Sequence, residues 1–192
     1  MAVSLDIANA FNTLPFGRVR EALRHHGFPR YLQMVVENYL QEREVLYMGA
    51  DGQMRRRVIQ CGVPQGSVLG PLLWNLGYDW ILRGAQLPES EVICYADDTL
   101  VVAKGRDYDE VARRATVATA LTVSRIELLG LKVALSKTEV VMFYGLRGKP
   151  PYGAEIVVRD VRIAVAPHIK YLGLTLSIFS PPLSNLTKAS KE

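Results

Sequence analysis

Two adjacent carboxylates, Asp97 and Asp98, are the residues whose types and spacing most directly predict chemistry in this sequence. They lie between two apolar runs, 92–94 and 99–103, whose β-branched residues are typical of strands. A tight hairpin would place both carboxylates at its tip, whereas adjacent side chains on a straight strand point to opposite faces. Two neighbouring carboxylates repel unless a cation lies between them, and Mg²⁺ prefers hard oxygen ligands. The other interpretation of these residues alone is an Asp-rich surface turn.

The composition is that of a folded protein with a mild excess of positive charge. Of the 192 residues, 49% are hydrophobic, which allows a real core and predicts one domain. The net charge of +4 permits a polyanionic partner without requiring one. The two cysteines, Cys61 and Cys94, are too few for a disulfide framework or a zinc site, which fits a reducing compartment. The sequence shows no apolar run of roughly 20 residues and no signal peptide, so we expect a soluble, intracellular protein without a membrane partner.

The periodicity of apolar residues predicts an alternation of strands and helices. The first strand, 2–5, ends at Asp6, and because it begins almost at Met1 we expect further chain upstream. The predicted helices span 14–26, 30–40, 69–82 and 108–129. The other predicted strands and extended segments span 44–48, 53–60, 92–94, 99–103, 132–135, 138–144, 155–158, 161–165 and 170–175. The polar stretch 177–192 predicts a disordered tail.

Two local patterns leave two interpretations open. The run Arg55, Arg56 and Arg57 lies on a predicted strand, where it is either a solvated edge that blocks aggregation or a patch that contacts phosphate. The stretch 62–67 (GVPQGS) is a loop that leads into a helix with Pro71 in its first turn. Its glycines allow close backbone approach to a ligand, and a helix N-terminus points amides at phosphate, but such loops are commonly structural.

The order of these elements predicts an α+β fold. A strand that ends in Asp6, helices, a hairpin that bears Asp97 and Asp98, a long helix and another strand make the split β-α-β arrangement of ferredoxin-like and RRM-like proteins. In that arrangement an antiparallel sheet has helices packed on one face, and its first strand lies beside the hairpin. Asp6 is therefore expected to reach the tip of the hairpin although about ninety residues separate them.

Five sequence stretches, in the same order, resemble the motifs of the reverse transcriptase palm, most closely that of non-LTR (LINE-like) retrotransposon polymerases. The second and third of these motifs are the most diagnostic. The stretches are 5–12 (LDIANAFN), 62–71 (GVPQGSVLGP), 95–98 (YADD), 130–132 with 136–139 (GLK and SKTE), and 171–173 (YLG). The resemblance covers 1–176 and implies a partial reverse transcriptase domain, an α+β palm whose fingers and thumb are truncated.

The resemblance implies catalytic roles. Asp6, Asp97 and Asp98 would hold two Mg²⁺ ions, with Mn²⁺ as a possible substitute, and the backbone of Ile7 could add a carbonyl ligand. One ion would activate the primer 3′-hydroxyl, and the other would hold the triphosphate. Asp6 and Asp97 would be the more direct ligands. Lys137 would protonate the leaving pyrophosphate or neutralise its charge.

The resemblance also implies binding roles. Phe11 would be the bulky ring that disfavours a ribose hydroxyl, although an isolated Phe is more commonly a core residue. The residues assigned to the incoming nucleotide and the template are Phe11, Pro64, Gln65, Gly66 and Tyr95. The residues assigned to the primer grip are Tyr171, Leu172 and Gly173.

The sequence is therefore compatible with three functions. The first is an RNA-directed DNA polymerase whose partners are an RNA template, a DNA primer and deoxynucleoside triphosphates, and which would act in the nucleus. The second is a truncated, catalytically silent retroelement fragment. The third is a non-enzymatic nucleic-acid-binding module, for which Arg55, Arg56 and Arg57 are the main support. In each case, palm surface that fingers would cover is expected to favour association with other proteins.

Overall fold

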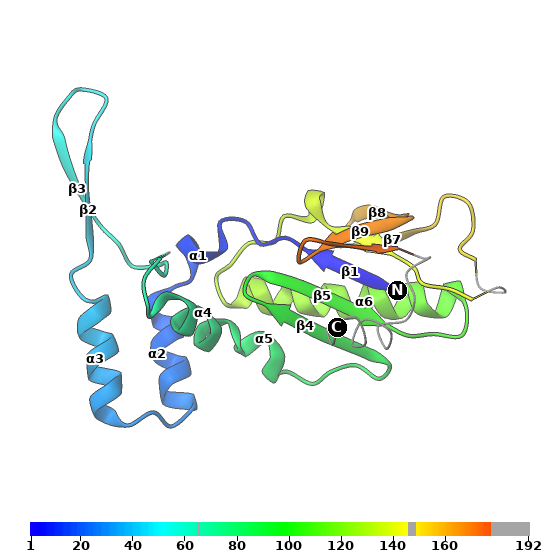
Figure 1. Cartoon of the computed structure of the whole chain (residues 1–192), viewed down its shortest axis with the longest axis horizontal. Helices are drawn as coiled ribbons and strands as arrows, with labels where there is room; N and C mark the ends of the chain where they lie inside the picture. The colour runs from blue at the N-terminus through cyan, green and yellow to red at the C-terminus, as the bar shows by residue number, and fades with distance from the viewer. Residues whose placement is uncertain (65, 146–148, 178–192) are drawn as a thin grey trace, which may run out of the picture. The chain divides into compact units, whose positions relative to one another are not determined.

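The computed structural model describes residues 1–64, 66–145 and 149–177. The chain forms two compact units (Figure 1). The first unit contains 1–6, 86–122 and the chain from 134 onward, and the second contains 7–85 and 123–133.

The first unit is built on a six-stranded sheet of order β4-β5-β1-β6-β8-β7. Strand β1 (Ala2–Leu5) lies in its interior, antiparallel to both β5 (Asp98–Ala103) and β6 (Glu139–Val141). The edge strand β4 (Ser90–Tyr95) pairs antiparallel with β5. Strand β8 (Val161–Ala166) runs parallel to β6 and antiparallel to β7 (Glu155–Val158). Residues nearly one hundred positions apart thus become neighbours in one ladder.

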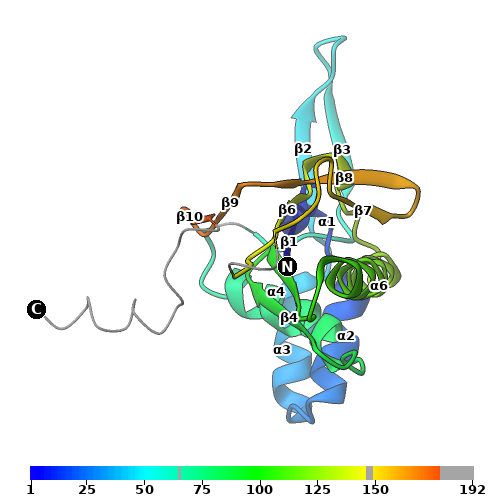
Figure 2. The ribbon, with the colours of Figure 1, turned by 90° about the vertical axis from the view of Figure 1, so that its right-hand side faces the viewer.

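Alternation along these strands gives the sheet two buried faces. On one face, Ala2, Leu100 and Val141 pack with Ile169 of strand β9 (His168–Tyr171), which pairs with β10 (Leu174–Ser177). On the other face lies α6 (Tyr108–Leu128), as the two views of Figures 1 and 2 agree. The Tyr108 hydroxyl donates to the backbone oxygen of Glu155 and accepts from its N–H, both at 2.9 Å, which ties α6 to β7.

The second unit is mainly helical. Its helices are α1 (Ala10–Thr13), α2 (Phe16–His25), α3 (Arg30–Leu40), α4 (Gly70–Tyr78) and α5 (Trp80–Arg83), together with the end of α6. A hairpin of β2 (Glu44–Met48) and β3 (Met54–Val58) extends from α3 (Figure 1). The core of this unit includes Trp74, whose ring stacks on Tyr78 with 5.0 Å between centroids.

Most predicted elements are confirmed, with corrections that local chemistry explains. The predicted helix 14–26 begins only at Phe16, because the residue before Pro15 is disfavoured in helical geometry and Leu14 is extended. The predicted helix 69–82 is interrupted at Asp79. The predicted strand 53–60 is shorter in the structure, where β3 spans Met54–Val58. Of the predicted extended segment 138–144, only Glu139–Val141 forms a strand, β6.

Two predictions near the C-terminal side, an extended segment and a strand, need correction. Segment 132–135 makes a single bridge, from Val133 to Ile7, and leads into a 3-10 helix, Leu135–Lys137. The segment 170–175 is not one strand but the turn of the β9–β10 hairpin, because Leu172 and Gly173 both have positive φ, of 50° and 77°. A chain with two such residues in succession reverses direction.

The first residue of the predicted disordered tail, Ser177, is instead the last residue of β10. The rest of the predicted tail, 178–192, lies outside the described residues. Within the described part of the chain, none of the helices combines the length and the hydropathy needed to cross a bilayer.

Candidate active site

Strand register in the first unit brings Asp6 to the same end of the sheet as the adjacent pair Asp97 and Asp98, although about ninety residues separate them in the sequence. Leu5 of β1 pairs with Thr99 of β5, so Asp6 follows β1 at the level where β5 begins with Asp98. Tyr95 pairs with Asp98 across a two-residue turn, Ala96–Asp97, in which Ala96 has a φ of 52°. Asp97 therefore lies at the tip of the hairpin, while Asp98 is the first residue of its second strand.

Lys137 joins this group from a different element. The 3-10 helix Leu135–Lys137 carries it, and its Nζ lies 3.3 Å from Oδ2 of Asp6. The backbone of Asp6 is fixed from the same side, because its carbonyl accepts a hydrogen bond of 2.8 Å from the N–H of Ala134. The Lys137 side chain is 70% exposed, so the pair is open to solvent and adds little to stability. The exposed ammonium of Lys137 therefore remains able to bind another anion.

The site has an excess of negative charge, since the three carboxylates are accompanied by the single ammonium of Lys137. Burial raises the pKa of Asp98, and the neighbouring charges of Asp97 and Asp6 raise it further. Neighbouring carboxylates are suitable oxygen donors for a hard divalent cation, whose charge offsets their mutual repulsion. Among the described residues, however, no three acidic, histidine or cysteine side chains are gathered closely enough to hold an ion as they stand. The donor chemistry thus suits Mg²⁺, and the assignment of particular ligands stays a prediction.

The aromatic residues assigned to this region lie on the same unit. Tyr95 ends β4, and its side chain is exposed. Tyr171 ends β9, and its buried hydroxyl has no hydrogen-bond partner among the described residues. Burial raises the pKa of Tyr171, as do the charges of Asp98 and Cys94, so this phenol lies in the field of the acidic group. The unpartnered Tyr171 hydroxyl could not be predicted from the sequence.

Leu172 and Gly173 follow Tyr171 in the first unit. The other assigned residues belong to the second unit, where hydrogen bonds join the first two motifs. The N–H of Val63 donates to the carbonyl of Phe11 at 2.7 Å, and that of Gly62 to the carbonyl of Leu14 at 2.8 Å. The Phe11 ring is half-buried, and its centroid lies 4.7 Å from that of Trp74. This contact orients the ring and is equally the contact of a core residue, so the sugar-gate role stays a prediction.

The loop between Pro64 and α4 is held by its own serine. The Ser67 hydroxyl donates to the Pro64 carbonyl at 2.8 Å and accepts from the N–H of Gly70 at 2.9 Å. Gly66 has a φ of +80°, which side chains rarely adopt, while the space around it is open. Gln65 lies outside the described residues. Ile7, the predicted source of a carbonyl ligand, is buried and bridges Val133 within its own unit.

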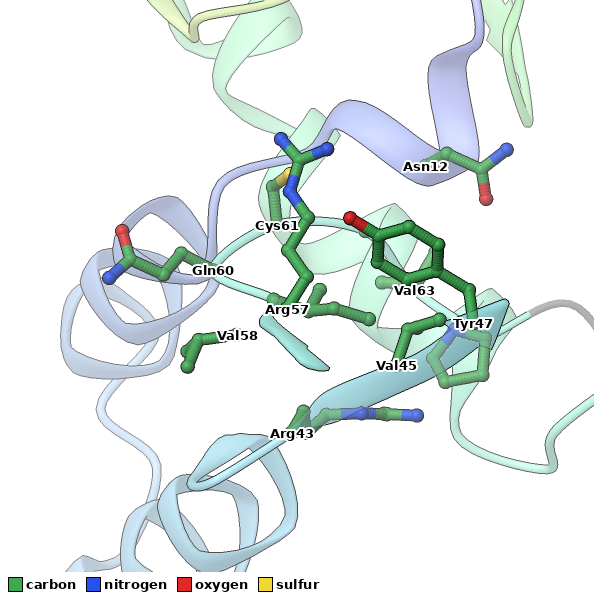
Figure 3. Close-up of a pocket in the computed structure, with 12 residues that line it drawn as sticks. Asn12, Arg43, Val45, Tyr47, Arg57, Val58, Gln60, Cys61 and Val63 are labelled. Atoms are coloured by element: carbon green, nitrogen blue, oxygen red, sulfur yellow. The ribbon is translucent and has the colours of Figure 1, made fainter. Parts of the chain in front are cut away.

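The arginine run of β3 does not act as one patch. Arg55 pairs with Asp51 at 2.8 Å, and Arg56 pairs with Glu44. Arg57 has no carboxylate partner among the described residues and lines a hollow at the base of the hairpin (Figure 3). The sequence alone offered two interpretations for all three residues together, because their partners are set by strand register and turn geometry.

Sheet, hairpin and acidic group together fit the palm of a nucleic-acid polymerase. Residues 1–176 match the model of the family described as "Reverse transcriptase (RNA-dependent DNA polymerase)". The chain belongs to this family, whose members are RNA-directed DNA polymerases.

The chain is similar to polymerases of non-LTR retrotransposons. It is 30% identical over 197 residues to the RNA-directed DNA polymerase from the mobile element jockey of Drosophila melanogaster, covering 96% of this chain and 21% of the relative. It is 28% identical over 195 residues to the probable RNA-directed DNA polymerase from transposon BS of Drosophila melanogaster, covering 97% of this chain and 21% of the relative. The chain therefore spans about a fifth of the length of these two relatives.

Among solved structures, telomerases share the fold. Apo telomerase from Candida tropicalis, truncated from its C-terminal domain, matches with a TM-score of 0.60 and 13% identity over 92% of this chain and 34% of that one. Telomerase from Candida albicans, in complex with a fragment of telomeric RNA, matches with a TM-score of 0.57 and 14% identity over 92% of this chain and 29% of that one.

Proposed function

We propose that this chain is the palm of a non-LTR retrotransposon reverse transcriptase, which adds deoxynucleotides to a primer 3′-hydroxyl on an RNA template. The observation that carries the proposal is the pairing of β1 with β5, which brings Asp6 to the end of the sheet where the Asp97–Asp98 hairpin turns. The finer fold proposed is the split β-α-β palm, supported by the order β4-β5-β1-β6 and by the antiparallel pairing of β1 with both neighbours.

The acidic group, which is Asp6, Asp97 and Asp98, and the neighbouring Lys137 would have different roles. Asp6 and Asp97, with Asp98 less directly and the carbonyl of Ile7, would hold Mg²⁺ ions. Divalent cations in such sites polarise phosphoryl oxygens and favour deprotonation of the attacking hydroxyl. Lys137 would leave Asp6 to neutralise or protonate pyrophosphate, which its exposed position allows.

Binding roles fall to the neighbouring residues. Phe11, oriented by Trp74, would discriminate against ribonucleotides, and the loop at Pro64 and Gly66 would approach the nucleotide and the template. Tyr171 and the turn Leu172–Gly173 would contact the primer. Each of these roles is supported by the matching motif and by the position of the residue in its own unit.

Primer extension on an RNA template, with deoxynucleotides and Mg²⁺ or Mn²⁺, tests the proposal. We expect extension by the wild-type chain and a loss of about a hundredfold or more in Asp97→Asn, because metal-held phosphate contributes several kcal/mol to the transition state. Asp160→Asn is the matched control, since Asp160 likewise occupies the second position of a two-residue hairpin turn, between β7 and β8, and is exposed.

No extension by a chain that circular dichroism shows to be folded would overturn the proposal of an active polymerase. The silent-fragment and binding-module interpretations would then be separated by RNA binding. Equal loss in Asp97→Asn and Asp160→Asn would contradict the assignment of Asp97.

A further inference from the structure

A hollow of about 690 Å³ lies in the second unit, where the β2–β3 hairpin meets the segment 59–64. This volume is within the range of ligand-binding pockets. Twelve residues of the described chain line it, and none is acidic. Figure 3 shows Arg57 and Tyr47 reaching from the hairpin toward the segment that carries Cys61 and Val63. Of the lining residues, Pro64 is also assigned to the proposed active site, whereas Arg43, Tyr47 and Arg57 are not.

The hairpin register explains why one arginine is available on this side. Arg57 pairs with Val45 and lies diagonal to Tyr47 on the same face, whereas Arg56 pairs with Leu46 on the opposite face. Arg56 is neutralised by Glu44 and Arg55 by Asp51, but Arg57 has no carboxylate within ion-pair distance among the residues described. The face that lines the hollow therefore has a positive charge without a counterion.

A second cation at the hollow has an unsatisfied donor. The guanidinium carbon of Arg43 lies 5.2 Å from the centre of the Tyr39 ring, which fixes the side chain. Its Nη1 atom is buried and has no hydrogen-bond partner among the described residues. Buried charged donors are seldom left unpaired, and Arg43 adds a second positive charge to the lining of the hollow.

An aromatic ring completes the set. Tyr47 lines the hollow and is 45% exposed, so its ring is accessible for stacking with a planar group. Cations that contact phosphate, together with an aromatic ring on which a base stacks, are the means by which proteins hold single strands without reading their sequence.

We propose that this hollow binds a single-stranded polynucleotide, with Arg57 and Arg43 on backbone phosphates and a base stacked on Tyr47. The inference deepens the proposed function, since it names residues through which the polymerase would hold a strand without contacting the acidic group. Phosphate and base occur in both RNA and DNA, and the test below separates the two sources.

The test measures binding of a labelled oligouridylate of about 20 nucleotides, longer than the ~4–16 that one binding fold covers, by fluorescence anisotropy. The chain is used in full, with EDTA and no deoxynucleotides. We expect Arg57→Gln to weaken binding about tenfold, and to reduce the slope of log K against log salt by about 0.7. Arg56→Gln is the matched control, because it removes the same charge from the adjacent residue, and we expect a change within about twofold.

Tyr47 provides an independent arm of the same titration. Tyr47→Leu should weaken binding about tenfold, and Tyr47→Phe should retain it, because stacking needs the ring and not the hydroxyl. Equal binding by Tyr47→Leu and wild type would overturn the stacking role. The same titration with oligothymidylate shows whether DNA serves as well as RNA.

Three results would overturn the proposal: no binding of either oligonucleotide, equal weakening by Arg56→Gln and Arg57→Gln, or displacement by polyglutamate as effective as by RNA.

Cys61 lines the hollow and is exposed, so bound RNA should slow its alkylation by iodoacetamide. Unchanged alkylation at saturating RNA would place the strand elsewhere. Binding is measured with EDTA and without deoxynucleotides, so loss of polymerisation and loss of binding are distinguishable.

Discussion

The ammonium of Lys137 and the carboxylate of Asp6 form an ion pair in which both partners face solvent. Such pairs contribute at most about 1 kcal/mol to stability. The pair can therefore open with little cost when a more strongly negative group, such as a polyphosphate, enters. Function and stability are separable at this residue.

Replacing Lys137 by Gln should reduce single-turnover nucleotide incorporation by roughly 10²-fold, because loss of a positioned proton donor typically costs about 10²–10⁴ in rate. The midpoint of thermal unfolding should change by less than about 2 °C. The pH profile of incorporation distinguishes the roles, since Lys137→Arg keeps the charge but cannot release a proton near neutral pH. An unchanged rate in Lys137→Gln would remove this residue from catalysis.

Asp98 gives a prediction about pH. Its raised pKa means that the folded state binds a proton that the unfolded state has lost, so this carboxyl contributes stability at low pH that is lost as the pH rises through the raised pKa. Asp97→Asn removes one of the causes, so we expect it to lower the pKa of Asp98 and to increase stability at pH 7 by about 0.5 kcal/mol in metal-free buffer. Carbon-13 titration of Asp98 measures the first effect and urea unfolding the second. A pKa that does not move in Asp97→Asn would contradict the coupling.

At the scale of elements, the β9–β10 hairpin places a leucine where the backbone disfavours it. Leu172 has a φ of 50° and is followed by Gly173 at 77°, a pair of values for which Asn-Gly is the preferred sequence. A strained residue at a tip is commonly retained for function.

Leu172→Asn should therefore stabilise the chain by about 0.5–1 kcal/mol while reducing primer extension, because the predicted primer contact is lost. The free energy of unfolding in urea and the extension rate are the two measurements. Arg159→Asn is the matched control, since Arg159 holds the equivalent position in the β7–β8 turn with a φ of 47°. Full extension by Leu172→Asn would argue against its predicted role in the primer grip.

Gly62 joins the loop of the second motif to α1. A Cβ here would lie 2.9 Å from the carbonyl oxygen of Asn12, and the φ of +92° would also strain any side chain. Gly62→Ala should destabilise the chain by about 2–3 kcal/mol. Gly52→Ala, at a φ of +73° with open space around it, should cost about 1 kcal/mol. Chemical unfolding measures both, and equal costs would show that the contact with Asn12 is not tight.

Local patterns predicted those elements whose signals lie within the element itself. The helix α3 begins and ends where its periodicity predicted, and the strand pair around Asp97 follows from β-branched runs on both sides of a turn. The sequence could not reveal that 170–175 turns back at Leu172, since leucine gives no turn signal. It could not separate Arg57 from Arg55 and Arg56 either, because strand pairing and the β2–β3 turn decide their partners.

At the scale of the whole molecule, the predicted site residues fall into two groups. The acidic residues, Lys137 and Tyr171 belong to the first unit, and Phe11, Pro64 and Gly66 belong to the second. The order of motifs along the chain predicted the family, which the match over 1–176 confirms. The assignment of each residue to metal, nucleotide or primer stays a prediction, because bound groups determine it.

The amino group of Met1 allows a prediction for the stability of the whole chain. It donates to the carbonyl of Ala103 at 2.8 Å, and burial lowers its pKa from 8.0 to about 6. The unfolded state binds this proton more tightly, so stability should rise by about 2–3 kcal/mol between pH 6 and pH 8 for a chain that begins with a free amino group at Met1. Urea unfolding across this range measures the rise. Acetylation of the amino group should abolish this pH dependence, and an unchanged slope would contradict its origin.

The interior position of β1 also has a consequence for protein synthesis. Its two flanking partners, 99–102 and 139–141, leave the ribosome long after the residues of β1 themselves. The residues of β1 must stay unpaired while the intervening chain is synthesised, with both edges of the strand open to wrong partners. Asp6 and Lys137 can meet only when the chain has emerged beyond residue 137, so the residues proposed to bind triphosphate come together only after the helices between them have been synthesised.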